Sequence, residues 1–182
     1  MRNIFLLVLI TVSTVTMAAT TKYFTRNGVI KFISDAPLEK NESVNKEVNI
    51  ILDPSTSSIA FKVVMKSFSF EKQAMKDHFN SKYMETDTYP NATFEGKVSG
   101  VPDWTKNGTY KATAEGKLTT HGVTQTVKQE GTIIIDNGKI TVSSEFTILL
   151  TDYKVAVPAN YVSKISNTIE IKVNGTLTPY QR

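Results

Sequence analysis

Residues 132–150 read TIIIDNGKITVSSEFTILL, which places two apolar arms on either side of a two-residue turn. The dipeptide Asn137-Gly138 favours a type I′ turn, the turn that best joins neighbouring antiparallel strands. In the second arm, apolar and polar positions alternate, and one face carries Ile140, Val142, Ser144, Phe146 and Ile148. A strand with one buried face has this period of two, so the segment predicts a β-hairpin.

Segments with the same period occupy most of the chain. Their predicted inward faces are Ile59, Phe61, Val63 and Met65; Ala92, Phe94, Gly96 and Val98; Tyr110, Ala112, Ala114, Gly116 and Leu118; and Ile169, Ile171 and Val173. Residues 28–34 and 44–52 are two earlier candidate strands. About eight strands with polar outer faces favour an all-β fold, either an antiparallel sandwich or a barrel. Because no internal repeat or linker divides the chain, we expect one folded domain.

Residues 70–83 interrupt the alternating pattern with a helical one. Ala74, Met75, His78, Phe79 and Tyr83 recur at the spacing of one helix face. We therefore expect a helix at about residues 71–83, inserted between two strands and lying across one mouth of the barrel.

The N-terminus has the pattern of a secretory signal peptide. Arg2 is followed by the apolar run 4–12 and then by small residues, with a cleavage site after Ala18 and one nearly as good after Ala19. The alternative is a membrane anchor, but the run is shorter than the roughly 20 residues that span a bilayer. We expect a cleaved signal at 1–18, one domain at 19–182, no stable membrane anchor, and a periplasmic or secreted protein.

Composition excludes several other classes of protein. The 182-residue chain has no cysteine, so it cannot be a disulfide scaffold or carry a lipid on a cysteine. The net charge of +4 is scattered along the chain, without the basic block that is typical of nucleic-acid binding. We expect no nucleic-acid partner, and the sequence is compatible with a homodimer.

Two segments carry a family resemblance. HFNSKYMETDTYPNATFEGKV, at 78–98, has a His-containing helix, an acidic loop, Tyr-Pro and an alternating strand, and GKLTTHGVTQTV follows at 116–127. Together they resemble the YceI-like family of exported lipid- and polyisoprenoid-binding proteins. The segment LTDYKVAVP keeps Asp152 and an aromatic residue, Tyr153, but has Lys154 where many members have glycine.

The resemblance implies a lipocalin-like antiparallel barrel whose apolar channel holds an isoprenoid or other long-chain lipid, with no catalytic residues. The residues alone leave the channel undecided. Small inward residues such as Ala112, Ala114 and Gly116 either leave room for a ligand, receive large side chains from across the core, or let the barrel bend. With the resemblance we favour a channel, and we expect it to be lined by Phe61, Met65, Met75, His78, Phe79, Tyr83, Phe94, Ala112, Ala114, Gly116, Phe146 and Ile148.

The two histidines are the main candidates for chemistry. His78 could form an acid–base site with Asp77 or Asp87, although a histidine on an apolar helix stripe more often packs and makes one hydrogen bond. His121 precedes Gly122 at a strand end, where we expect its ring to bond to loop backbone rather than to a metal. We predict no catalytic residue, no metal and no cofactor. Two alternatives remain: an enzyme that uses His78 on an apolar substrate in the cavity, and a structural β domain with a filled core.

Overall fold

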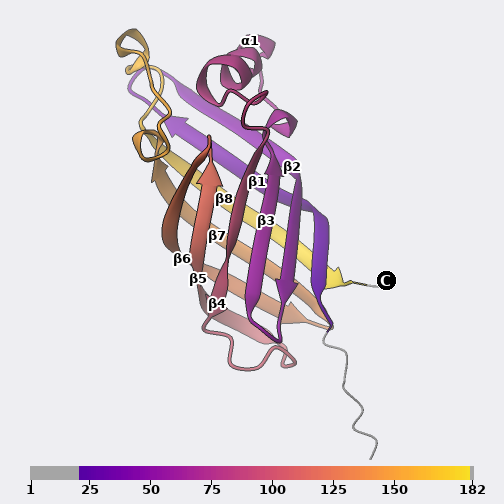
Figure 1. Ribbon diagram of the computed structural model, residues 1–182. Coiled ribbons are helices and arrows are strands. Elements are labelled where there is room, and N and C mark those ends of the chain that lie inside the picture. Colours follow the sequence, from indigo (N-terminus) through magenta and orange to yellow (C-terminus); the bar gives the residue numbers. More distant parts are fainter. Residues whose placement is uncertain (1–20, 181–182) are drawn as a thin grey trace, which may run out of the picture.

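The computed structural model describes residues 21–180, and the predicted signal peptide at 1–18 lies outside the described residues. Eight antiparallel strands form a closed barrel in which each strand pairs with the next and the last pairs with the first (Figure 1). The strands are β1 (Tyr23–Asp35), β2 (Lys40–Asp53), β3 (Ser58–Val64), β4 (Asn91–Ser99), β5 (Gly108–Thr120), β6 (Val123–Asp136), β7 (Lys139–Leu149) and β8 (Thr168–Pro179). The prediction of an all-β antiparallel barrel of about eight strands is confirmed.

The hairpin at 132–150 is present as the end of β6 and the whole of β7. Asp136 pairs with Lys139, and Asn137 and Gly138 both have positive φ, at 45° and 76°. Two consecutive positive φ angles define the type I′ turn, and asparagine and glycine adopt them at low cost. β6 begins at Val123, well before the predicted arm. The alternating pattern missed its first half because the residues there are mostly polar and exposed.

The barrel is filled at the end where this turn lies. At this end, the C-terminal ends of β2, β6 and β8 lie beside the N-terminal ends of β3 and β7. Their inward side chains are buried, namely Leu52, Ile59, Ile133, Ile135, Ile140 and Leu177. Gly28 of β1 and Gly175 of β8 leave room for the side chain of Ile50, which a Cβ atom at either position would meet. This half of the barrel is therefore a packed core.

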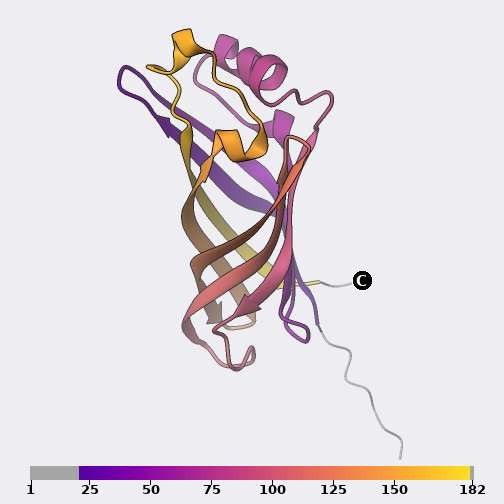
Figure 2. The ribbon, with the colours of Figure 1, turned by 60° about the vertical axis from the view of Figure 1, so that its left-hand side comes forward.

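The opposite end carries two insertions. Between β3 and β4 lie a 3₁₀ turn, Met65–Ser67, the helix α1, Gln73–His78, and a π-helical turn, Phe79–Tyr83. Between β7 and β8 lie the 3₁₀ turns Leu150–Tyr153 and Ala159–Tyr161. Figures 1 and 2 show both insertions over the same end of the barrel. The predicted helix at about 71–83, across one mouth, is confirmed. Between residues 21 and 180, no helix is both long and apolar enough to cross a bilayer.

Phenylalanine side chains attach the helical insertion to the barrel. The Phe79 ring stacks on Phe32 of β1 with ring centroids 5.5 Å apart, and it contacts Phe68 at 5.6 Å and Phe70 at 5.0 Å. Aromatic pairs at this spacing contribute roughly 0.5–1.5 kcal/mol each beyond their buried area. Ala74, expected on the same buried face, is exposed, so the face begins at Met75.

Phe79→Ala should loosen the helical insertion without unfolding the barrel. The substitution removes three ring contacts at roughly 0.5–1.5 kcal/mol each, so amides in 73–83 should exchange hydrogen about tenfold faster or more. Hydrogen exchange followed by mass spectrometry measures this directly. Lys82→Ala, an exposed position of the same insertion, is the control and should leave exchange unchanged. Wild-type exchange rates in Phe79→Ala would contradict the role assigned to the ring.

Candidate functional site

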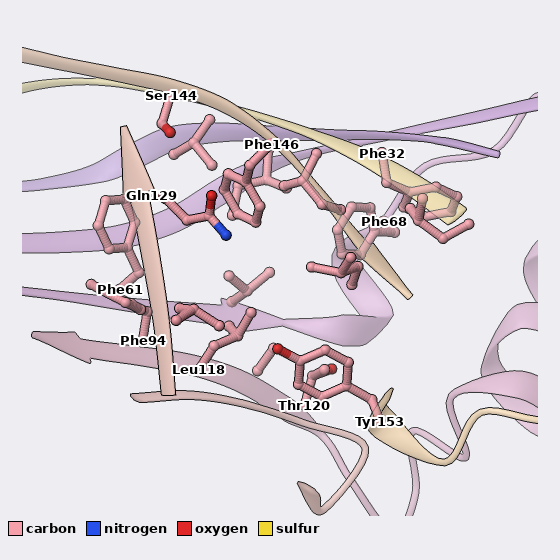
Figure 3. Close-up of a pocket in the computed structure, with 18 of the residues that line it drawn as sticks. Phe32, Phe61, Phe68, Phe94, Leu118, Thr120, Gln129, Ser144, Phe146 and Tyr153 are labelled. Carbon is pink, nitrogen blue, oxygen red and sulfur yellow. The ribbon is translucent and has the colours of Figure 1, made fainter. Parts of the chain in front are cut away.

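The half of the barrel below the insertions encloses a cavity of about 440 Å³. All eight strands contribute to its walls, and the helical insertion and the β7–β8 insertion contribute residues at the mouth. Cavities of about 300–1,000 Å³ with mostly apolar walls are typical of small-molecule sites. In Figure 3, Phe61 and Phe94 lie toward one end of the cavity and Phe32 and Phe68 toward the other.

Eleven of the twelve predicted channel residues line this cavity. They come from β3, β4, β5, β7 and the helical insertion and are Phe61, Met65, Met75, His78, Phe79, Tyr83, Phe94, Ala112, Ala114, Phe146 and Ile148. Gly116 is the exception, since it is absent from the lining. The structure thus gathers residues that are up to 87 positions apart, from Phe61 to Ile148, around one space. Their contact with a ligand remains a prediction.

Position 116 has no room for a side chain because β4 and β5 approach each other closely there. It pairs with Gly96 of β4, and a Cβ atom at Gly116 would overlap the carbonyl oxygen of Glu95. A Cβ atom at Gly96 would overlap the carbonyl oxygen of Glu115 in the same way. The two glycines therefore allow the backbones of β4 and β5 to lie in close contact, whereas Ala112 and Ala114 border open space.

Several lining residues were missed by sequence reasoning. Ile30, Phe32 and Ser34 alternate along β1 and line the cavity, so the period of two could have identified them. Gln129 lies on the inward face of β6 between Val127 and Gly131, but a polar residue there carries no signal of burial. The remaining missed residues that Figure 3 labels are Phe68, Leu118, Thr120, Ser144 and Tyr153.

Tyrosine hydroxyls add polar groups at the mouth end of the cavity. Tyr153 is only 3% exposed, and its ring projects into the cavity beside Thr120 (Figure 3). Burial raises the pKa of the Tyr153 hydroxyl, and the neighbouring Asp152 carboxylate raises it further. Burial, and then the nearby Tyr161, likewise raise the pKa of Tyr83. Both groups are therefore neutral phenols around neutral pH, able to hydrogen-bond but not to attract a charge.

His78 has no acid–base partner among the described residues. It is exposed at the mouth, and the two carboxylates proposed for it are engaged elsewhere. Asp77 accepts a 2.7 Å hydrogen bond from the Gln73 side chain, and Asp87 pairs with Lys66. The geometry gives His78 a place on the rim of the cavity without the paired carboxylate that acid–base chemistry requires.

His121 links three segments around the mouth. It occupies the β5–β6 turn with a positive φ of 49°. Its Nδ1 lies 3.0 Å from the Tyr153 carbonyl oxygen, its Nε2 lies 2.9 Å from Glu85 Oε2, and its ring packs edge-on against Tyr89. The predicted bond to loop backbone is confirmed, and residues 21–180 contain no cluster of metal-ligating side chains.

Comparisons with known proteins agree with this architecture. The family model of the YceI-like domain matches residues 11–177. The solved structure of BcnA from Burkholderia cenocepacia is 19% identical and has a TM-score of 0.68, with 83% of this chain and 96% of that one covered. A polyisoprenoid-binding domain from Saccharophagus degradans implicated in plant cell wall breakdown is 13% identical with a TM-score of 0.76, covering 87% and 98%.

The YceI protein of Campylobacter jejuni is 16% identical with a TM-score of 0.58, and both chains are fully covered. Among curated protein sequences, none matches this chain. At these identities the solved structures support the fold, and the family model supports membership of the family.

Ala114→Leu and Gly116→Ala should have different effects, because Ala114 borders the cavity and Gly116 packs against backbone in the wall. Leucine at 114 extends into open space, so we expect near wild-type stability and weaker uptake of a lipid chain. Alanine at 116 forces β4 and β5 apart, which should cost about 1–3 kcal/mol of unfolding free energy. Urea unfolding and displacement of a fluorescent lipid measure the two effects. A destabilised Ala114→Leu that binds lipid normally would mean that no open channel borders Ala114.

Proposed function

This chain belongs to the YceI-like domain family, and we propose that it binds a lipid with a long apolar chain in the barrel cavity. The ligand class is a polyisoprenoid, an isoprenoid quinone or a fatty-acid-like lipid. One observation carries the proposal: a closed barrel that is filled at one end keeps an apolar cavity of about 440 Å³ at the other. The description of the Saccharophagus domain as polyisoprenoid-binding supports the choice of ligand class.

The size of the cavity sets the length of chain that it can bury. A volume of about 440 Å³ holds about 15 groups of water size at ~30 Å³ each, and a methylene group is of similar size. At about 0.8 kcal/mol for each buried methylene, the gross stabilisation is about 12 kcal/mol. Association costs of at least ~4 kcal/mol leave at most about 8 kcal/mol, which corresponds to micromolar or weaker affinity. Such binding requires no specific polar contact.

Binding without turnover is the activity that this geometry supports. The cavity wall combines aromatic, aliphatic and methionine side chains, and Met65, Met75 and Met84 can adapt to a flexible chain. We further propose that the protein works outside the cytoplasm, on the basis of the signal-peptide pattern at 1–18. Its role would be to sequester or carry a lipid that water does not dissolve.

Affinity should rise with chain length and then level off. In a series of straight-chain alcohols from about 8 to 24 carbons, each methylene should tighten binding about fourfold until about 15 carbons are buried. Further carbons stay outside the cavity and should add little. Displacement of a fluorescent fatty acid measures the series, and an affinity that does not depend on chain length would contradict the proposal.

A further inference from the structure

The barrel wall is split on the mouth side of Gly131 and Ser144. Among the described residues, β6 and β7 pair only from Gly131–Ser144 to Asp136–Lys139. By contrast, β6 pairs with β5 from Val123 to Ile135, and β7 pairs with β8 to its end at Leu149. Residues 123–130 and 145–149 are therefore strand segments that each have a partner on one side only.

A comparable gap elsewhere in the wall is closed. β2 and β3 also share a short ladder, from Asn49–Lys62 to Asp53–Ser58. Beyond it, Val44 and Ser69 exchange two backbone hydrogen bonds of 3.3 and 2.9 Å, and the Asn45 side chain donates to the Val64 carbonyl at 2.8 Å. The insertion after β3 thus seals that gap.

Within residues 21–180, hydrogen bonds cross the split between β6 and β7 only at its two ends. Near the mouth, Gln125 Nε2 donates to the Asp152 carbonyl at 3.0 Å. At the other end, the Ser144 hydroxyl donates to the Glu130 carbonyl at 2.5 Å. In between, the structure of residues 21–180 has no hydrogen bond from 126–129 to 145–148. Val127, Gln129, Phe146 and Ile148 from the two edges all line the cavity.

An outer hollow borders the same part of the wall as the cavity, next to the point where the strands part. This second hollow, of about 420 Å³, lies over β1, β6, β7 and β8. The two spaces share five lining residues, Gly131, Thr132, Ser143, Ser144 and Val173. Lys31 and Lys172 border the hollow, but carboxylates hold both: Lys31 pairs with Glu42, and Lys172 pairs with Glu145 and Glu170.

Polar groups mark the same place from the inside. Apart from Thr93, the polar residues that line the cavity form two groups, one at the mouth and one at the split. The group at or next to the split consists of Gln129, Glu130, Thr132, Ser143 and Ser144. In Figure 3, the Gln129 amide points into the cavity. An amide donates and accepts hydrogen bonds but carries no charge, and the two lysines that border the outer hollow are already paired with carboxylates. This combination suits an uncharged hydrogen-bonding group better than an anion.

We propose that the split between β6 and β7 is a side opening of the cavity and that the polar, uncharged end of the bound lipid occupies it. The inference rests on the proposed function and adds the position and chemistry of the end group. The lipid chain lies in the cavity, and its alcohol, amide or carbonyl end reaches the Gln129 amide. The end group then faces the outer hollow rather than the mouth under α1.

Crosslinking across the split tests the opening. Because the chain has no cysteine, Lys128→Cys/Thr147→Cys places the only two thiols on opposite edges, where the β6–β7 register would continue. A short bis-maleimide joins them and narrows the split. Lys117→Cys/Thr126→Cys, a directly paired and exposed position of β5 and β6, is the matched control that joins strands where the wall is already closed.

Two uncharged probes are compared. Decanol fits inside the cavity, whereas hexadecylamine capped with a nitrobenzoxadiazole group is too large to fit completely. After crosslinking of 128 to 147, we expect decanol binding to be unchanged and binding of the capped probe to fall about tenfold or more, since methylenes kept out of the cavity each cost about fourfold. The 117–126 crosslink should affect neither probe, and circular dichroism checks folding in each case.

Equal binding of the capped probe by both crosslinked proteins would overturn the side opening. So would a wild-type protein that binds decanol but not the capped probe. Failure of wild type to bind decanol at all would instead refute the proposed function, and the inference with it.

Discussion

Closure of the sheet between β1 and β8 is the constraint on which the cavity depends. β1 pairs with β2 along one edge and with β8 along the other, from Tyr23–Pro179 to Ser34–Ile169. Without that second ladder, the inward face of the sheet would be exposed to water. With it, eight strands enclose an interior just wide enough to be filled by side chains or to hold one slender ligand.

Which of these outcomes occurs depends on side-chain size at each level of the barrel. Isoleucine and leucine side chains from β2, β6, β7 and β8 are buried at one end and fill it. Toward the other end, Ala112 and Ala114 of β5 leave space that Phe61 and Phe94, whose rings are 6.1 Å apart, border without filling. The same fold thus provides a packed core at one end of the barrel and an open cavity at the other.

The mouth of the cavity is covered by segments that the barrel alone would not hold. The Phe79 ring fixes the helical insertion to β1, and His121 ties the β5–β6 turn to Glu85 and to the Tyr153 carbonyl. These contacts are few compared with the ladders of the wall, so the cover is the part of the structure that opens at least cost. A side opening between β6 and β7 would give the lipid's end group a place that does not require the cover to stay displaced.

The period of two along the strands predicted an all-β antiparallel fold and the inward faces of its strands, while the choice of a barrel with a channel rested on the family resemblance. Side chains at i and i+2 share a face of a strand, so Phe61, Phe94, Ala112 and Phe146 could be assigned inward from the sequence alone. Gly116 shares that face, yet only the register with Gly96 shows that it serves backbone contact. The positions of Gln129 and Tyr153 depend on where β6 leaves β7 and where the β7–β8 insertion folds back. Both are properties of tertiary structure that local pattern does not encode.

If the cavity holds one long-chain lipid, native mass spectrometry of the protein purified from its own host without detergent should detect it. We expect a species heavier than the bare chain by the mass of one lipid, which solvent extraction removes and recovers in the organic phase. A spectrum of the bare chain alone, with no lipid in the extract and no uptake of added fatty alcohol, would contradict it.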